Sequence, residues 1–254
     1  MRQDVDYFAH AKEYIINDFN NPKVSTKSFF NFLQKYNSLD CMSNEIILDI
    51  GAGGCSGTAY FAKKKKSVDF YGVDYNKELV KWVNEVLWVE NKQYKLENLN
   101  LIYGDWNNPE AIKKDVKGSK IKCIISVHSL CTQKNFRDSM ESLISLDSEF
   151  IAINSLFYNG PLDVLIHIRD NKITDDNPDA DFNIHSLTEA DKFMLSKGYK
   201  NIFTEFFEIN LDLPKPLNGE RGTYTINSSI SKYTQFSGPV FLPWHFVLYK
   251  RFET

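Results

Sequence analysis

The sequence is poor in cysteine, with four in 254 residues: Cys41, Cys55, Cys123 and Cys131. They form no Cys-x-x-Cys pair and no cysteine and histidine spacing typical of a zinc site. We therefore expect no metal site and no disulfide framework, and reduced thiols are the default.

An excess of positive charge is also missing. The chain has 30 lysine and arginine residues against 33 aspartate and glutamate residues, and its formal net charge is −3. Binding to nucleic-acid phosphates needs clustered basic side chains. We therefore do not expect a nucleic-acid partner.

Long apolar segments are absent as well, although hydrophobic residues make up an ordinary 43% of the chain. The N-terminal stretch MRQDVDYFAHAKEYI carries acidic side chains and lacks the apolar core of a secretion signal. We expect a cytoplasmic protein without membrane association. No internal repeat or low-complexity linker divides it, so we expect a single domain over residues 1–254.

What the chain does contain is a regular alternation of apolar runs and helical patterns. Apolar runs at residues 45–51, 67–74, 99–105, 120–129 and 149–158 predict buried parallel strands. Two helices are expected in residues 1–44, and a capping box starts another helix at Ser186. Two strands near the C-terminus, at 201–213 and 245–252, resemble a hairpin pair. The alternation predicts an α/β fold with an open, mostly parallel sheet and helices on both faces.

Two long segments, residues 159–184 and 214–244, fall outside this alternation. Both should emerge over the edge formed by the carboxyl ends of the strands, where such sheets bind ligands. Loops of this length are usually lids or binding loops. Disordered decoration is the alternative.

The stretch EIILDIGAGGCSGTAYF indicates a nucleotide-type turn, because its glycines let backbone amides approach a ligand ahead of a helix N-terminus. A dinucleotide fingerprint would need glycine at position 56, which is Ser56 here. Asp49, two residues before Gly51, would repel a pyrophosphate but suits a ligand with an ammonium group. S-adenosylmethionine is such a ligand.

The turn resembles motif I of the class I S-adenosylmethionine-dependent methyltransferases, with Asp49, Gly51 and Gly53 in place and Cys55 where the third glycine usually stands. The resemblance implies a Rossmann-like sheet of seven strands with an antiparallel last strand. It also implies an N-terminal helical cap (1–44), a cofactor-binding core (45–158) and substrate loops at 159–184 and 214–244.

The same resemblance implies roles for residues at the ends of the next strands. Asp74 would accept the ribose hydroxyls, with the N-cap of the next helix as its alternative role. Asp105 would bind the adenine amino group and Trp106 would lie against the ring. The cofactor-binding residues expected in all are Asp49, Gly51, Ala52, Gly53, Asp74, Tyr75, Asp105, Trp106 and His128.

Four side chains are candidates for catalysis or acceptor binding: His128, Tyr158, His167 and Arg169. His128 ends the fourth strand and could act as a base, orient the acceptor, or bond the methionine part of the cofactor. Arg169 could clamp a carboxylate or phosphate, or pair with Asp163 or Asp170. The later segment adds Arg221, Tyr224, Trp244 and His245, of which the last two could simply anchor the final strand.

Together these features predict a methyltransferase that acts on a small polar, possibly anionic, acceptor. The Pro-Pro-aromatic motif associated with amino-group methylation in nucleic-acid enzymes is absent from the end of the fourth strand, which favours a small-molecule acceptor. O-methylation is the favoured reaction. A weak likeness to enzymes of surface polysaccharide and phosphoramidate methylation suggests a capsule precursor. A nicotinamide-dependent oxidoreductase and a non-catalytic S-adenosylmethionine-binding protein are the alternatives, and the oligomeric state is open.

Overall fold

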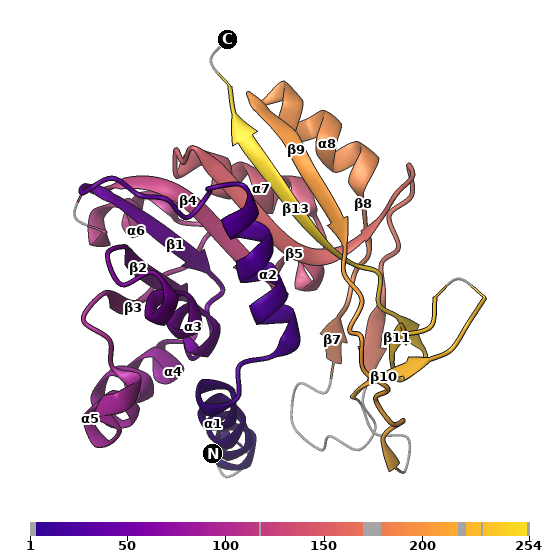
Figure 1. Ribbon diagram of the computed structural model, residues 1–254, viewed down its shortest axis with the longest axis horizontal. Coiled ribbons are helices and arrows are strands. Elements are labelled where there is room, and N and C mark those ends of the chain that lie inside the picture. The colour runs from indigo at the N-terminus through magenta and orange to yellow at the C-terminus, as the bar shows by residue number, and fades with distance from the viewer. Residues whose placement is uncertain (1–3, 117, 170–178, 218–221, 230, 253–254) are drawn as a thin grey trace.

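The computed structural model describes residues 4–116, 118–169, 179–217, 222–229 and 231–252 (Figure 1). Its centre is a sheet with the strand order β3-β2-β1-β4-β5-β13-β9, and the short β8 pairs with β5 beside this path. The seven strands on the path are β1 Glu45–Ile50, β2 Asp69–Asp74, β3 Leu99–Tyr103, β4 Lys120–Val127, β5 Phe150–Tyr158, β9 Tyr199–Phe206 and β13 Trp244–Arg251.

Neighbouring strands from β3 to β5 are parallel, whereas β13 runs antiparallel to both β5 and β9. The expected α/β architecture, with a mostly parallel sheet and one antiparallel strand, is therefore confirmed. The order reverses between β1 and β4, so their carboxyl ends flank the position where open sheets of this kind bind ligands.

Both faces of the sheet are covered because alternate residues of its strands point to opposite sides. Every residue of β1 is buried, and Ile47 packs into one hydrophobic cluster while Ile46 and Leu48 pack into the other. One cluster includes residues of the N-terminal helices and α3, and the other includes residues of α6, α7 and α8. Apart from the N-terminal helices, the helices of the two clusters are α3 Ser56–Lys64, α6 Pro109–Asp115, α7 Phe136–Ser145 and α8 Leu187–Ser196.

A longer helical segment follows β2. It begins as α4 Lys77–Trp82, widens into a π-helical turn over Val83–Leu87, and ends as α5 Trp88–Glu90. One short 3-10 turn, Lys92–Tyr94, precedes β3, and another, Leu130–Thr132, follows β4.

Two helices precede the first strand, and their role as a cap stays a prediction. Helix α1 spans Asp4–Asn20 and α2 spans Val24–Lys35. The rings of Phe29 and Phe32 pack on Phe246 of β13 with centroids 5.1 and 5.5 Å away. Figure 1 shows α2 in front of the sheet, whereas α1 lies below it at the lower edge of the view.

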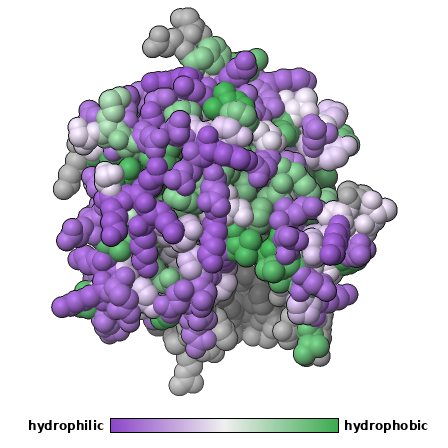
Figure 2. Space-filling model, in the orientation of Figure 1, coloured by the Kyte–Doolittle hydropathy of each residue, from purple (hydrophilic) through white to green (hydrophobic). Residues whose placement is uncertain are grey.

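The described parts of the two long segments form small antiparallel sheets, so disordered decoration is the wrong description for them. In the first, β6 His167–Arg169 pairs with β7 Asp179–Asp181. Strand β8, His185–Ser186, follows this segment and runs parallel to β5. In the second, β10 Thr223–Ile226, β11 Thr234–Ser237 and β12 Val240–Phe241 make a three-stranded sheet. Figure 2 shows hydrophobic residues gathered between the N-terminal helices and these strands, on a face that is mostly hydrophilic.

Within the described ranges, no helix is both long and apolar enough to cross a membrane.

Candidate functional site

The glycine turn after β1 begins with a left-handed backbone. Gly51 has φ +76°, and a Cβ there would lie 2.1 Å from Ser129 Oγ, so the position requires glycine. The amides of Gly51 and Ala52 donate to the carbonyl of Val73 at 2.9 and 3.0 Å, which ties the turn to the end of β2. The turn is thus held open towards the edge of the sheet.

Cys55 departs from the motif pattern yet fits its place. Its φ is +63°, in the left-handed region where glycine is usual, and its side chain is fully buried. The sulfur fits against β2 because Gly72 has no side chain, since a Cβ on Gly72 would lie 2.2 Å from Cys55 Sγ. Gly72 therefore compensates for the missing third glycine of the motif.

Asp49 is buried beneath the turn. Burial raises the pKa of its carboxyl to about 7, and nearby Asp74 adds to the shift, while a hydrogen bond from Thr58 Oγ1 at 2.5 Å opposes it. A desolvated carboxyl of this kind gains stability from any cation placed against it. The position is therefore suited to a cation, and the role of Asp49 in ligand binding stays a prediction.

Asp74 links the turn to the next helix. Its two carboxylate oxygens accept from the amides of Gly53 at 2.8 Å and Asn76 at 2.9 Å. The N-cap of α4 is Asn76, whose side chain accepts from the amide of Leu79 at 3.0 Å. The alternative role of Asp74 as N-cap is therefore wrong.

Asp105 and Trp106 follow β3 in an exposed turn. The Asp105 carboxylate accepts from the amide of Asn107 at 2.9 Å, which fixes the turn. Trp106 is half-buried and packs on the core below. Both residues line the same cavity as Asp74 and Tyr75.

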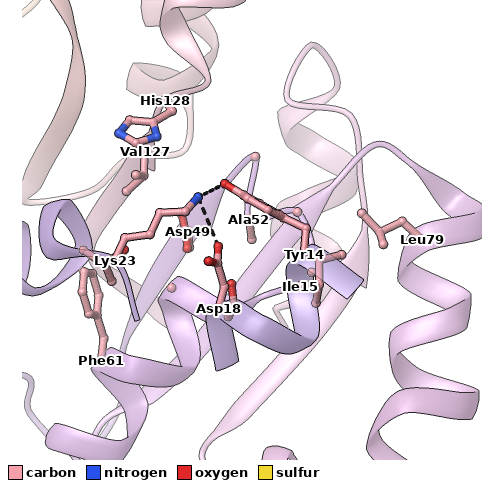
Figure 3. Close-up of a pocket in the computed structure, with 16 residues that line it drawn as sticks. Tyr14, Ile15, Asp18, Lys23, Asp49, Ala52, Phe61, Leu79, Val127 and His128 are labelled. Carbon is pink, nitrogen blue, oxygen red and sulfur yellow. Dashed lines mark hydrogen bonds and ion pairs between the residues drawn. The ribbon is translucent and has the colours of Figure 1, made fainter. Parts of the chain in front are cut away.

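Two adjoining cavities lie at the carboxyl ends of the strands. The larger, of about 610 Å³, contains Asp74, Tyr75, Asp105 and Trp106 in its wall. The smaller, of about 380 Å³, is walled by the glycine turn, Asp49 and residues of the N-terminal helices (Figure 3). Gly51 and His128 line both, so the two cavities meet beside these residues. Every cofactor-binding residue expected from the sequence lines one of the two.

Solved structures resemble this arrangement at low sequence identity. A 1,6-didemethyltoxoflavin-N1-methyltransferase from Burkholderia thailandensis, with 1,6-didemethyltoxoflavin and S-adenosylhomocysteine bound, matches with TM-score 0.55 and 12% identity over 100% of this chain and 92% of that one. Magnesium protoporphyrin IX methyltransferase (ChlM) from Synechocystis, with S-adenosylhomocysteine bound, matches with TM-score 0.53 and 11% identity over 90% and 82%. An S-adenosylmethionine-dependent methyltransferase from Methanosarcina mazei matches with TM-score 0.54 and 10% identity over 88% and 98%.

The chain has the fold of the class I methyltransferases. A scan against protein-family models finds no match, and neither does a search of the curated proteins. The likeness therefore lies in the fold, and the chemistry has to be argued from the residues in the two cavities.

His128 occupies the junction of the cavities in this methyltransferase fold. It has a left-handed backbone (φ +60°), and its ring lies 4.3 Å from that of Trp244. The side-chain nitrogen of buried Asn154 lies 3.1 Å from Nε2. As oriented, the amide donates to Nε2, so the neutral ring carries its proton on Nδ1. Burial, aided by nearby Lys23, lowers the pKa of His128 to about 3, which keeps the ring uncharged at neutral pH.

The other three catalytic candidates lie outside the walls of both cavities, and their roles stay predictions. Tyr158 is about half exposed at the end of β5. His167 Nδ1 lies 3.1 Å from Asp181, a residue that does line the larger cavity. Arg169 is exposed on β6, while one of its suggested partners, Asp163, accepts from the amide of Ser186 at 2.6 Å. The other suggested partner, Asp170, lies outside the described residues.

The candidates of the later segment differ in position. Arg221 lies outside the described residues. Tyr224 is buried and donates to the carbonyl of Gly238 at 2.7 Å, a structural contact. Trp244 packs against His128, which lines both cavities, but does not itself line either one. His245 Nδ1 lies 3.0 Å from the carbonyl of Pro243.

The sequence interpretation missed the polar residues that the N-terminal helices bring to the smaller cavity. Tyr14 and Asp18 of α1, and Lys23 just before α2, line it together (Figure 3). The spacing of Tyr14 and Asp18, four residues apart on one helix face, is the signal that could have found them. No group of three or more histidine, cysteine or acidic side chains suited to a metal ion occurs in the part of the chain that the structure describes.

Proposed function

We propose that the chain is an S-adenosylmethionine-dependent methyltransferase acting on a small polar acceptor. The observation that carries the proposal is the order of carboxylates around the two joined cavities: Asp49 below the turn, then Asp74 and Asp105 at the ends of the next strands. A cationic ligand that carries a ribose and an adenine matches this order, because each part meets an acidic acceptor or an aromatic ring.

The residues fit that cofactor. Asp74 would accept the ribose hydroxyls, Asp105 the adenine amino group, and the Trp106 ring would lie against the base, while Asp49 faces the charged end. When bound, S-adenosylmethionine supplies a methyl group on a positively charged sulfur. The protein's own part is to hold both reactants in line and to exclude water.

His128 narrows the class of acceptor. A group with a pKa of about 3 is a weak base at neutral pH and would remove a proton from an alcohol inefficiently. Its Nδ1–H can instead donate to an oxygen that is already anionic. We therefore propose a carboxylate or phosphate oxygen as the methyl acceptor, with His128 orienting it. A surface polysaccharide or phosphoramidate precursor is one acceptor of this kind.

The first test is mass spectrometry of the purified protein for bound S-adenosylhomocysteine, followed by calorimetric titration with S-adenosylmethionine and with NAD. We expect binding of S-adenosylmethionine only. Binding of NAD without S-adenosylmethionine would overturn the proposal in favour of an oxidoreductase.

The second test uses methyl-labelled S-adenosylmethionine with a panel of small carboxylates, phosphates and phosphoramidates, and a matched panel of neutral alcohols. We expect label transfer to the anionic panel. Transfer to alcohols alone would contradict the assigned role of His128. Cofactor binding without transfer to any compound would indicate a non-catalytic binding protein.

A further inference from the structure

Three polar side chains from the N-terminal helices meet in the smaller cavity. Tyr14 and Asp18 extend from α1, and Lys23 reaches across the cavity from the start of α2 (Figure 3). The Lys23 ammonium donates to the Tyr14 hydroxyl oxygen and lies 3.1 Å from Asp18 Oδ2. The cluster therefore places a cation, an anion and a hydroxyl at one end of the proposed cofactor site.

Lys23 keeps its charge in this setting. Burial disfavours the charged form, but the Tyr14 oxygen and the Asp18 carboxylate outweigh that effect and raise the pKa of Lys23 above its ordinary value. The Lys23 side chain is partly exposed, with 37% of its surface accessible, and the Asp18 side chain is more buried at 18%. Charges shielded from water in this way interact more strongly with a ligand than surface charges do.

Helix α1, which carries Tyr14 and Asp18, forms one wall of the smaller cavity. A Cβ on Gly54 of the glycine turn would lie 2.6 Å from Ile15, so the turn and α1 are in direct contact. Ile15 follows Tyr14 in sequence and is buried. The distance between the glycine turn and the cluster is therefore fixed by packing.

The charges of the smaller cavity complement an amino-acid zwitterion. Asp49 and Asp18 supply negative charge, and Lys23 with the Tyr14 hydroxyl supplies donors for a carboxylate. With Asp49 ionised, these side chains carry a net charge of about −1 from two carboxylates and one ammonium. The methionine end of S-adenosylmethionine carries the opposite total, because its ammonium, sulfonium and carboxylate sum to about +1.

We propose, resting on the proposed function, that Tyr14, Asp18 and Lys23 form with Asp49 a clamp for the amino-acid end of the cofactor. Lys23 and Tyr14 hold the carboxylate, and Asp18 and Asp49 hold the ammonium. The larger cavity binds the adenosine part, and the amino-acid part lies in the smaller cavity. The two parts of the ligand meet beside Gly51 and His128, which line both cavities.

The competing explanation is a structural latch in which Lys23 only ties α2 to α1. The two explanations differ in which ligands they affect. A clamp acts only on ligands that contain the amino-acid group. A latch would change the stability of the cap and alter all ligands of the site alike.

The test compares calorimetric titrations with S-adenosylhomocysteine, which has the amino-acid group, and 5′-methylthioadenosine, which lacks it. We expect Lys23→Met to weaken S-adenosylhomocysteine by on the order of tenfold to a hundredfold, through loss of a charge-assisted hydrogen bond. The affinity for 5′-methylthioadenosine should change less than about twofold. Lys27→Met, an exposed lysine of α2, is the matched control and should affect neither ligand.

Two outcomes would overturn the clamp while leaving the proposed function intact: Lys23→Met binds S-adenosylhomocysteine as the wild type does, or it loses both ligands equally. Tyr14→Phe removes only the hydroxyl and keeps the packing of the ring, so it tests the clamp without the risk of a folding defect. We expect it to weaken the binding of S-adenosylhomocysteine by a smaller factor than Lys23→Met does, and to leave the binding of 5′-methylthioadenosine unchanged. A wild-type protein that binds neither S-adenosylhomocysteine nor S-adenosylmethionine would overturn the proposed function itself.

Discussion

The carboxylate of Asp74 accepts a hydrogen bond from the amide of Gly53 at 2.8 Å, and this contact joins the end of β2 to the glycine turn after β1. One side chain thus shapes the turn and faces the larger cavity at the same time. Changes at Asp74 should therefore affect ligand binding directly and through the turn.

Replacing Asp74 with alanine should weaken S-adenosylhomocysteine binding by about 2 kcal/mol, because a charged acceptor for the ribose hydroxyls is lost. Calorimetry measures this directly. Asp69→Ala, at the exposed start of the same strand, is the control and should leave the dissociation constant unchanged. An Asp74 variant with wild-type affinity would remove this residue from the site.

Binding should also depend on pH through Asp49. The pKa of this buried carboxyl is about 7 in the free protein, so below pH 7 the ammonium group of a ligand must displace a proton. We expect the affinity for S-adenosylhomocysteine to rise as the pH increases from 5.5 and to level off above about pH 7, by on the order of tenfold in all. Titrations across that range, with adenosine as the uncharged reference, check the slope. Asp49→Asn should abolish it, and a flat wild-type profile would contradict the assigned role.

The raised pKa of Asp49 also affects the stability of the folded chain, which should fall with rising pH while ligand affinity rises. The folded chain binds this proton more tightly than the unfolded chain, whose carboxyl has the ordinary pKa of 3.8. Asp49 therefore contributes stability at low pH that is lost as the pH rises towards about 7. Denaturant unfolding of the wild type and Asp49→Asn at pH 5 and pH 8 should show a smaller change with pH in the variant.

His128 should remain neutral over the whole physiological range. Because burial lowers its pKa to about 3, its ring signals in ¹⁵N-resolved NMR should not titrate between pH 5 and pH 8. The shifts should also show Nε2 as the unprotonated nitrogen, as the contact with Asn154 requires. His128→Gln identifies the signals. A midpoint near 6.5 would restore His128 as a candidate base.

Crowding at the glycine turn can be separated from backbone strain by a matched pair of variants. Gly51 and Gly118 have similar positive φ angles of +76° and +72°, but only at Gly51 would a Cβ meet another atom. Gly118→Ala should cost about 1 kcal/mol of unfolding free energy from strain alone. Gly51→Ala should cost more, by about 1–3 kcal/mol, because Ser129 must move. Equal losses in denaturant unfolding would argue against the close contact.

The parallel core of the fold could be predicted because its strands are buried on both faces. A strand such as β1, in which every residue is buried, leaves a continuous apolar run, and the acidic residues that end it and its neighbours mark the edge of the sheet. The small sheets of the two long segments could not be predicted, since β6, β7 and β12 are only two or three residues long. Strands so short carry almost no periodic signal.

The residues that line the two cavities at the glycine turn and the strand ends could also be identified from the sequence, because they lie within a few positions of strand ends. The sequence did not identify Lys23 and Asn154 as residues of the candidate site. It gave Trp244 only as a candidate that could instead anchor the final strand. Trp244 meets His128 from more than a hundred residues away in sequence, and Asn154 meets it from 26 residues away, so both contacts depend on how the strands pair in the sheet. The role of Asp74 as a tether of the turn was hidden for the same reason.

The position of β13 has a consequence for how the chain folds. The strand that comes last in sequence lies between β5 and β9, and its register places His245 opposite both Ser155 and Phe206. While the chain is being synthesised, β5 has an open hydrogen-bonding edge until this final strand arrives. The nascent chain therefore passes through a stage in which the five parallel strands β1 to β5 can pair while the outer edge of β5 still lacks its partner, and at that stage it is exposed to aggregation.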